Sequence, residues 1–165
     1  MNLKPIPNYQ GLYSLDLNNN QVYGHKHKKY KNPILDKYGY YTIQLCKKNS
    51  KLKNFKIHRL VYELHFGTIP EGLYIDHIDT NRENNNIDNL RLCTQSQNCM
   101  NRKTSKNNLS TGYKNIYKTK CNTYNVTISI NRKKVYQKNF KTLEEAILNR
   151  NIQLVLIHGE YANLG

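Results

Sequence analysis

The chain has 165 residues, a mass of 19.5 kDa, an apolar fraction of 38%, no Trp and 14 Tyr. Its formal net charge of +15 attracts polyanions, of which nucleic acid is the commonest. The mean hydropathy of −0.82 and the lack of a long apolar run argue against one large core, a membrane span and a signal peptide, so we expect a soluble intracellular protein of small modules.

The charge is divided unevenly along the chain. Residues 1–70 hold twelve Lys and Arg against three Asp and Glu, and residues 103–165 hold eleven against three. Residues 71–102 hold three against five, so two cationic segments flank an acidic centre. A surface that only binds phosphate has no need of such a centre, whereas a divalent-metal site does.

The four cysteines are scattered without a C-x-x-C motif. Cys93 and Cys99 lack a second pair at ligand spacing, so we predict no zinc site. Free thiols in a reducing compartment are the expected state.

Residues 1–55 contain the short apolar runs LYSL, QVYGH and YYTIQLC, separated by turn residues such as Asn18–Asn20 and Tyr38-Gly39. This spacing predicts a small antiparallel sheet, which we expect to contact DNA. The run HKHKKYKNP, residues 25–33, is either a solvated loop or a loop that contacts phosphates.

Residues 56–102 are predicted to form a helix, a strand, a long Asn-rich loop, a second strand and a second helix. The apolar face of the first helix is made of Ile57, Leu60, Val61 and Leu64. Gly67 can end this helix, and EGLYIDHI and LRLC are the two expected strands. Thr94 and Gln97 form a capping box, so the second helix should begin at Thr94.

Residues 103–110 are polar and charged, which is typical of a linker. Residues 111–165 contain three expected strands, GYKNIYK, TYNVTISIN and KKVYQKNF, and then a helix with a Thr142–Glu145 capping box. The helix residues expected to cover the apolar face of the sheet are Leu143, Ala146, Ile147, Leu154 and Ile157. The fold class is therefore α+β, with a C-terminal three-stranded antiparallel sheet packed on one helix.

The other face of the middle strand is polar, because Asn125, Thr127 and Ser129 alternate with the apolar residues. With Lys114 and Lys118 nearby, we expect this face to lie in a DNA groove.

The acidic centre contains the candidate chemistry. Asp76 and His77 are adjacent on the first central strand, and Asn98 lies in the first turn of the helix that begins at Thr94. Carboxylate and amide oxygens suit Mg²⁺, and a neutral imidazole can take a proton from an attacking water. Metal and base together can hydrolyse a phosphodiester, although neighbours on a strand point to opposite faces unless the backbone bends.

The other polar residues of the centre have structural explanations. Asn81, Asn84, Asn85 and Asn86 are expected to hold the backbone of the loop, with Asp79 as a turn former. Asn89 is expected to fix the loop beside the strand of the histidine. Arg102 is either a phosphate contact or an exposed cation. His58 and His65 are assigned to packing or to the helix surface, with a place beside the site left open for His58.

The stretch HRLVYELHFGTIPEGLYIDHIDTNRENNNIDNLRLCTQSQNCMNR resembles the HNH endonuclease family, and most of all its phage and intron-encoded homing branch. Asp76 stands where the family name has its first histidine, a replacement common in that branch. The resemblance implies a ββα-metal nuclease core in which Asp76 and Asn98 hold the metal, His77 is the general base and Asn89 orders the loop. The implied cofactor is a divalent cation, Mg²⁺ with Mn²⁺ as the alternative.

The flanking segments carry further resemblances. KPIPNYQGLYSL with YGYYTIQL resembles a module that often precedes the nuclease, and TGYKNIYK…YNVTISI…FKTLEEA…HGEYANLG resembles an APETALA-type DNA-binding domain, with Tyr124 in place of the usual Trp. Together the resemblances imply a virus- or mobile-element-encoded homing or nicking nuclease that acts on double-stranded DNA, as a monomer or alternatively a dimer. Its products would carry 5′-phosphate and 3′-hydroxyl ends, and cleavage of one strand or of both stays open. The competing hypotheses are a DNA-binding regulator with an inactive core and an RNA-binding module in which Tyr113 and Tyr117 stack on bases.

Overall fold

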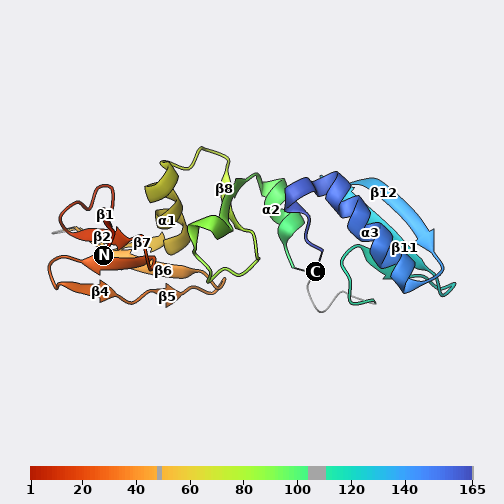
Figure 1. The fold of residues 1–165 in the computed structure, drawn as a ribbon, viewed down its shortest axis with the longest axis horizontal. Helices are drawn as coiled ribbons and strands as arrows, with labels where there is room; N and C mark the ends of the chain where they lie inside the picture. The colour runs from red at the N-terminus through yellow and green to blue at the C-terminus, as the bar shows by residue number, and fades with distance from the viewer. Residues whose placement is uncertain (48–49, 104–110, 165) are drawn as a thin grey trace. The chain divides into compact units, whose positions relative to one another are not determined.

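The structure is a computed structural model that describes residues 1–47, 50–103 and 111–164 (Figure 1). It divides into two compact units, Met1–Leu92 and Cys93–Gly165. The predicted mixture of helices and strands is confirmed. Residues 104–110 of the predicted linker lie outside the described residues. Among the helices described, none has the length and apolar character needed to cross a bilayer.

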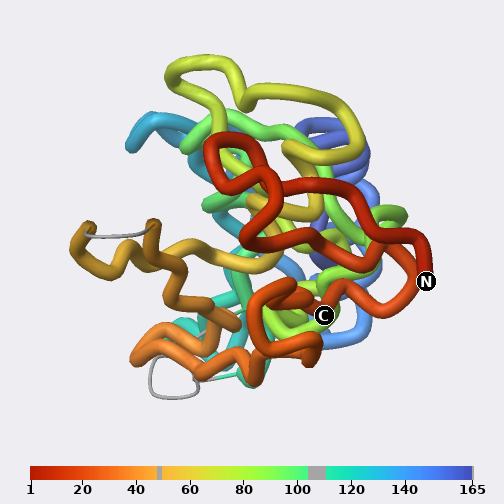
Figure 2. The backbone as a smooth tube through the Cα atoms, turned by 90° about the vertical axis from the view of Figure 1, so that its left-hand side faces the viewer, coloured from red at the N-terminus to blue at the C-terminus, as the bar shows by residue number. Residues whose placement is uncertain are grey.

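The first unit begins with two antiparallel sheets rather than the single sheet predicted. The first sheet has the order β1 (Leu3–Pro5), β2 (Tyr13–Asp16), β3 (Gln21–Gly24) and β4 (Lys29–Lys31). The second has the order β5 (Ile34–Leu35), β6 (Tyr41–Leu45) and β7 (Lys53–Lys56). In Figure 2 these hairpins are the red and orange parts of the tube. Part of the run HKHKKYKNP is therefore strand β4, an edge strand whose lysines hide it from hydrophobicity patterns.

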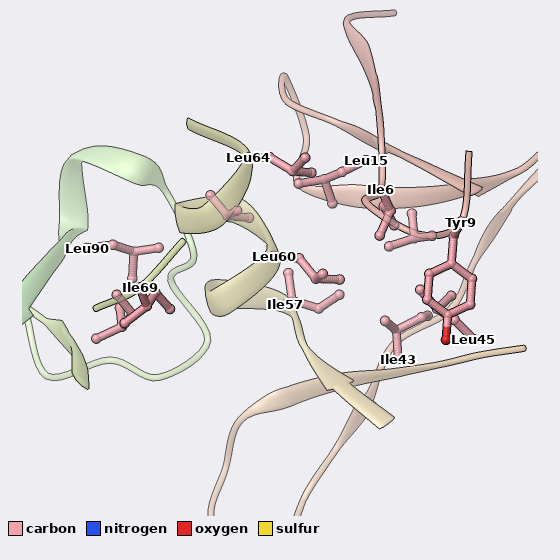
Figure 3. Packing of buried hydrophobic residues seen from close by; sticks show 13 residues of the cluster. Ile6, Tyr9, Leu15, Ile43, Leu45, Ile57, Leu60, Leu64, Ile69 and Leu90 are labelled. Atoms are coloured by element: carbon pink, nitrogen blue, oxygen red, sulfur yellow. The ribbon is translucent and has the colours of Figure 1, made fainter. Parts of the chain in front are cut away.

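Helix α1 (Ile57–Phe66) connects these sheets to the centre of the chain. Its predicted apolar face is confirmed as buried, and Gly67 follows it with a φ of 91° that favours glycine. Figure 3 shows this face among apolar residues from both sides, which include Ile6, Tyr9, Leu15, Ile43, Leu45, Ile69 and Leu90. Residues 1–55 and the beginning of segment 56–102 thus share one hydrophobic core. The predicted module boundaries stay predictions.

The central strands are β8 (Tyr74–His77) and β9 (Leu90–Cys93), which form a two-stranded sheet. A short 3₁₀ helix, η1 (Ile87–Asn89), precedes β9, and α2 (Gln95–Asn101) follows it. The capping box of Thr94 and Gln97 is present as predicted. With Cys93 the chain enters the second unit.

The second unit has one sheet and one long helix. The strands β10 (Ile116–Lys118), β11 (Tyr124–Ile130) and β12 (Lys133–Phe140) are antiparallel, and α3 (Leu143–His158) begins at the capping box of Thr142 and Glu145. A 3₁₀ helix, η3 (Gly159–Tyr161), follows. The five helix residues predicted to cover the sheet all belong to its core, together with Ile116, Val126 and Ile128.

Candidate active site

Strand β8 buries an acid and an imidazole next to each other. Asp76 is 5% exposed and His77 is 4% exposed, and both follow the buried Ile75. Burial of a charged or titratable group costs free energy unless a partner compensates it, so such a pair needs a specific environment. As expected for neighbours on a strand, the two side chains have different surroundings. A shared pocket for them stays a prediction.

The burial of His77 favours its neutral form. Its Nε2 is 3.4 Å from Asn85 Oδ1, and its ring centroid is 5.1 Å from that of His58 and 5.9 Å from that of Tyr40. Burial lowers the pKa of His77 by more than the bond to Asn85 and the nearby Asp79 raise it. The imidazole is therefore neutral at physiological pH, which is the form that can accept a proton.

His58, for which the sequence left two readings open, borders His77. It lies in the first turn of α1, and its ring centroid is 4.9 Å from that of Tyr40. Burial, followed by the neighbouring His77, lowers its pKa from 6.5 to about 3. Among the described residues its Nδ1 has no hydrogen-bond partner. His65, at the other end of α1, bonds instead to Val61 O with its Nδ1 at 2.8 Å.

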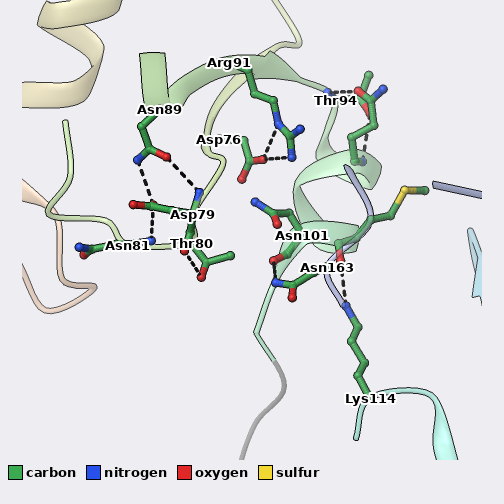
Figure 4. Close-up of polar contacts among 12 residues, drawn as sticks. Asp76, Asp79, Thr80, Asn81, Asn89, Arg91, Thr94, Asn101, Lys114 and Asn163 are labelled. Carbon is green, nitrogen blue, oxygen red and sulfur yellow. Dashed lines mark hydrogen bonds and ion pairs between the residues drawn. The ribbon is translucent and has the colours of Figure 1, made fainter. Parts of the chain in front are cut away.

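Asp76 is paired with Arg91 of the neighbouring strand β9. Arg91 Nε and Nη2 lie 3.0 and 2.9 Å from Asp76 Oδ2 (Figure 4). The arginine compensates the buried carboxylate and fixes one of its oxygens. Arg91 was missed in the sequence, although an acid and a base on two strands predicted to be neighbours are a signal for such a pair.

Asn89 holds the two ends of the loop together (Figure 4). Its Oδ1 accepts from Asp79 N at 3.0 Å, while its Nδ2 donates to Asp79 Oδ1 at 2.9 Å and Asn84 O at 2.8 Å. Asp79 also accepts from Asn84 Nδ2 and Asn81 N, each at 2.7 Å. Burial opposes ionisation of Asp79, but these bonds outweigh it and lower its pKa. The position of Asn89 supports the loop-ordering role that the sequence predicts for it.

Asn85 differs from the other loop asparagines, because it contacts His77 directly. Its Nδ2 donates to Glu83 O at 3.2 Å, and its carbonyl accepts from Asn20 Nδ2 at 3.1 Å. Nothing in the sequence distinguishes Asn85 for this role, because it is the middle one of three consecutive asparagines.

Two cations were also missed. Lys56 Nζ is 4.1 Å and Arg82 Cζ is 5.0 Å from the centroid of the Tyr40 ring, which itself contacts His77. Arg82 Nη1 also donates to Tyr38 O at 2.6 Å. The N-terminal segment therefore contributes Tyr40 to the surroundings of His77, together with positive charge.

Asn98 belongs to α2 and Arg102 directly follows this helix, both in the second unit. Asn98 is half-buried in the first turn, and Arg102 is exposed where the helix ends. A metal shared by Asn98 and Asp76 stays a prediction, as does a phosphate contact from Arg102.

The residues predicted to contact DNA in the second unit have different environments. Asn125, Thr127 and Ser129 lie on the face of β11 opposite the core. Asn125 Nδ2 donates to Asn139 Oδ1 at 2.6 Å, and Asn125 Oδ1 accepts from Thr127 Oγ1 at 2.5 Å. Lys118 is exposed. Lys114 is half-buried instead, and its ammonium donates to carbonyl oxygens at the end of α2. Its predicted phosphate contact would have to compete with these bonds.

The donor chemistry of β8 fits a hard cation. No group of three or more His, Cys, Asp and Glu that could hold a metal is present in the part of the chain that the structure describes. One buried carboxylate with an amide oxygen suits Mg²⁺, which keeps several water or phosphate oxygens.

A mixed α/β fold with a buried, neutral histidine beside an acid, and with a loop held by an asparagine, fits a hydrolytic enzyme of the nuclease class. The family described as HNH endonuclease matches residues 55–100. The HNH endonuclease L560 of Acanthamoeba polyphaga mimivirus is 36% identical over 132 residues, 79% of this chain and 68% of that protein. The chain belongs to the HNH endonuclease family.

Two further comparisons involve one relative. The DNA endonuclease I-HmuI of Bacillus phage SP01 is 41% identical over 102 residues, 61% of this chain and 57% of that protein. The solved structure described as "DNA binding and cleavage by the HNH homing endonuclease I-HmuI" has a TM-score of 0.54 and 29% identity, and covers 96% of this chain and 91% of that chain. The likeness thus extends over nearly the whole chain.

Proposed function

We propose that this nuclease is a metal-dependent, site-recognising DNA endonuclease of the homing type. The observation that carries the proposal is the buried, neutral His77 beside the buried Asp76. A protein that only bound DNA would gain nothing from the cost of burying both groups. Relatives that are named as homing endonucleases, including I-HmuI and YosQ of Bacillus subtilis, support the same reading.

In this proposal His77 is the general base. When Nε2 carries the ring proton, it donates to Asn85 Oδ1, and Nδ1 is then the basic nitrogen. His77 takes the proton of the attacking water, and the water oxygen attacks the phosphorus. The P–O3′ bond breaks, which leaves a 5′-phosphate and a 3′-hydroxyl. Asn89 acts through the loop between β8 and β9, because it bonds to the backbone of Asp79 and of Asn84.

A divalent cation, Mg²⁺ or Mn²⁺, would be held by the carboxylate of Asp76 and the amide oxygen of Asn98. When bound, it would stabilise the negative charge that develops on the phosphate and on the leaving oxygen. Arg91 holds Asp76 Oδ2 and so orients the carboxylate for this role.

The cationic flanks would bind double-stranded DNA. Lys56 and Arg82 carry positive charge to the neighbourhood of His77, where the phosphate is cut. The N-terminal module and an APETALA-like domain over residues 111–165 would contact the duplex on either side. The half-buried amide of Asn125 on β11 has donor and acceptor groups that can distinguish base pairs.

The test uses a plasmid library of random inserts, incubated with Mg²⁺ or Mn²⁺, with the ends of the products mapped. We expect cleavage by the wild type and by the control variant His65→Ala, and a loss of about 10²-fold or more in His77→Ala. EDTA should abolish cleavage. Equal cleavage by His77→Ala would overturn the assignment of the base, and binding without any cleavage would favour a regulator with an inactive core.

A further inference from the structure

Helix α2, which carries Asn98, is too short to be stable by itself. It has seven residues, Gln95–Asn101, and isolated helices of this length do not persist in water. Its last carbonyl groups also lack partners within the helix. The position of Asn98 therefore depends on what holds the end of this helix.

Two side chains from the C-terminal segment hold it. Lys114 Nζ donates to Met100 O at 3.0 Å, to Arg102 O at 3.3 Å and to Cys99 O at 3.4 Å. Asn163 Nδ2 donates to Asn101 O at 2.6 Å (Figure 4). Four consecutive carbonyls at the end of α2 thus accept hydrogen bonds from residues that lie 12 or more positions further along the chain. A cation at this end of a helix also interacts favourably with the helix dipole.

These two donors are fixed by the fold of the second unit. Lys114 precedes Asn115, whose carbonyl accepts from Thr127 N of β11 at 2.9 Å. Asn163 precedes Leu164, whose carbonyl accepts from Arg150 Nη1 at 3.2 Å, and Arg150 is fully buried on α3. At the other end of α2, Ser96 Oγ is 3.3 Å from Asn131 Oδ1, in the turn between β11 and β12.

We propose that Lys114 and Asn163 are positioning residues, through which the C-terminal sheet and helix hold α2 and therefore place Asn98. The face of β11 and the metal ligand then move as one body, so that binding of this face to DNA also orients Asn98. The proposal rests on the proposed role of Asn98 in metal binding. It replaces the expectation of a nuclease core that is complete at residue 102 and only tethered to the segment from 111.

The first experiment needs no metal or DNA. Hydrogen–deuterium exchange of the full-length chain is compared between Lys114→Met and Lys120→Met, because Lys120 is an exposed lysine of the same unit and controls for the lost charge. In Lys114→Met we expect the amides of residues 98–102 to exchange about tenfold faster. The loss of a charge-assisted hydrogen bond raises the equilibrium constant for local opening of the helix by about that factor. Equal exchange in the two variants would overturn the proposal.

The second experiment measures single-turnover cleavage against Mn²⁺ concentration. In Lys114→Met we expect the half-saturating Mn²⁺ concentration to rise about tenfold, while DNA affinity falls only as much as in Lys120→Met. Lys114→Arg, which keeps a cationic donor, should restore most of the loss. Faster exchange of α2 with an unchanged Mn²⁺ dependence would overturn the link to Asn98. If the wild type does not cleave at all, the proposed function fails, while the exchange experiment still tests the holding of α2.

Lys114→Met could also unfold the second unit, which circular dichroism would reveal. In that case hydrogen–deuterium exchange and the Mn²⁺ dependence of cleavage are measured on Asn163→Ala, which removes one bond to Asn101 O. We expect smaller shifts in the same direction, about threefold. The absence of both shifts in a folded Asn163→Ala variant would contradict the proposal.

Discussion

The loop between β8 and β9 is rich in asparagine, whereas the polar face of β11 carries one, Asn125, and the two regions use this residue type in different ways. In the loop, Asn89 is buried and directs its amide to a backbone N–H, a carboxylate and a carbonyl. On the sheet, the side chain of Asn125 bonds to the side chains of Asn139 and Thr127 and stays partly accessible. The same residue type thus fixes the backbone in one region and presents polar groups in the other.

The comparison separates two kinds of function. An amide with several buried partners contributes to stability, and its replacement disturbs the chemistry next to it. An amide on an exposed face can exchange its partners for those of a base edge at little cost. Mutations in the two regions should therefore change different measurements.

The largest expected effect is that of Asn89→Ala. The variant leaves Asp79 N and Asn84 O without their bonds, which should lower the free energy of unfolding by about 2–4 kcal/mol. Cleavage should also fall, because the loop that begins directly after His77 loses its anchor. Urea denaturation and the cleavage assay measure the two effects.

Asn86→Ala is the matched control for Asn89→Ala. Asn86 is exposed in the same loop and makes one long bond, in which Asp88 N donates to its Oδ1 at 3.3 Å. We expect a loss of less than about 1 kcal/mol and normal cleavage. Equal losses in the two variants would mean that burial does not distinguish the loop asparagines.

A smaller effect concerns His58 and pH. Its pKa is 6.5 when unfolded and about 3 in the folded protein, so the unfolded chain binds the proton first as the pH falls. The stability that the neutral His58 contributes is complete above pH 6.5 and is lost progressively toward pH 3. Between pH 7 and pH 5 the free energy of unfolding should fall by about 2 kcal/mol through this group.

Urea denaturation at both pH values, in the wild type and in His58→Gln, tests this linkage. The Gln side chain does not titrate, so the variant should lose most of that difference. His65→Gln, on the same helix, is the control and should keep the pH dependence of the wild type. A His58→Gln variant with the wild-type dependence would show that the acid sensitivity has another origin.

Local signals predicted much of the fold. The buried face of α1, both capping boxes and the alternation along β11 depend on residues within one turn or one strand, and all are present. Strand β4 was missed because Lys29, Tyr30 and Lys31 form a polar edge strand, which pairs with β3 through its backbone and has no apolar alternation.

The candidate site was less predictable, because its environment is made by distant residues. Asp76, His77 and Asn89 could be proposed from one continuous motif. Tyr40 reaches His77 from a position 37 residues earlier, and nothing in its own segment marks it. The same holds for Lys114, which an expectation based on charge assigned to DNA, while its ammonium lies at the end of α2. The charge of a lysine indicates that it interacts with an anion or a dipole, but which partner it has depends on the fold.

The smallest expected effect is that of Asn125→Ala on the sheet. The side chain is partly accessible, so the free energy of unfolding should change by less than about 0.5 kcal/mol. Binding to the recognition sequence should weaken by about 1 kcal/mol of binding free energy, while binding to unrelated DNA should change little. The reason is that a base contact carries sequence information. Lys118→Met provides the contrast: a phosphate contact should weaken binding to all sequences alike and reduce the salt slope by about one. Binding titrations at several salt concentrations, with both DNA types, separate the two outcomes. If Asn125→Ala weakened both DNA types equally, the face of β11 would bind the backbone of the duplex rather than distinguish its bases.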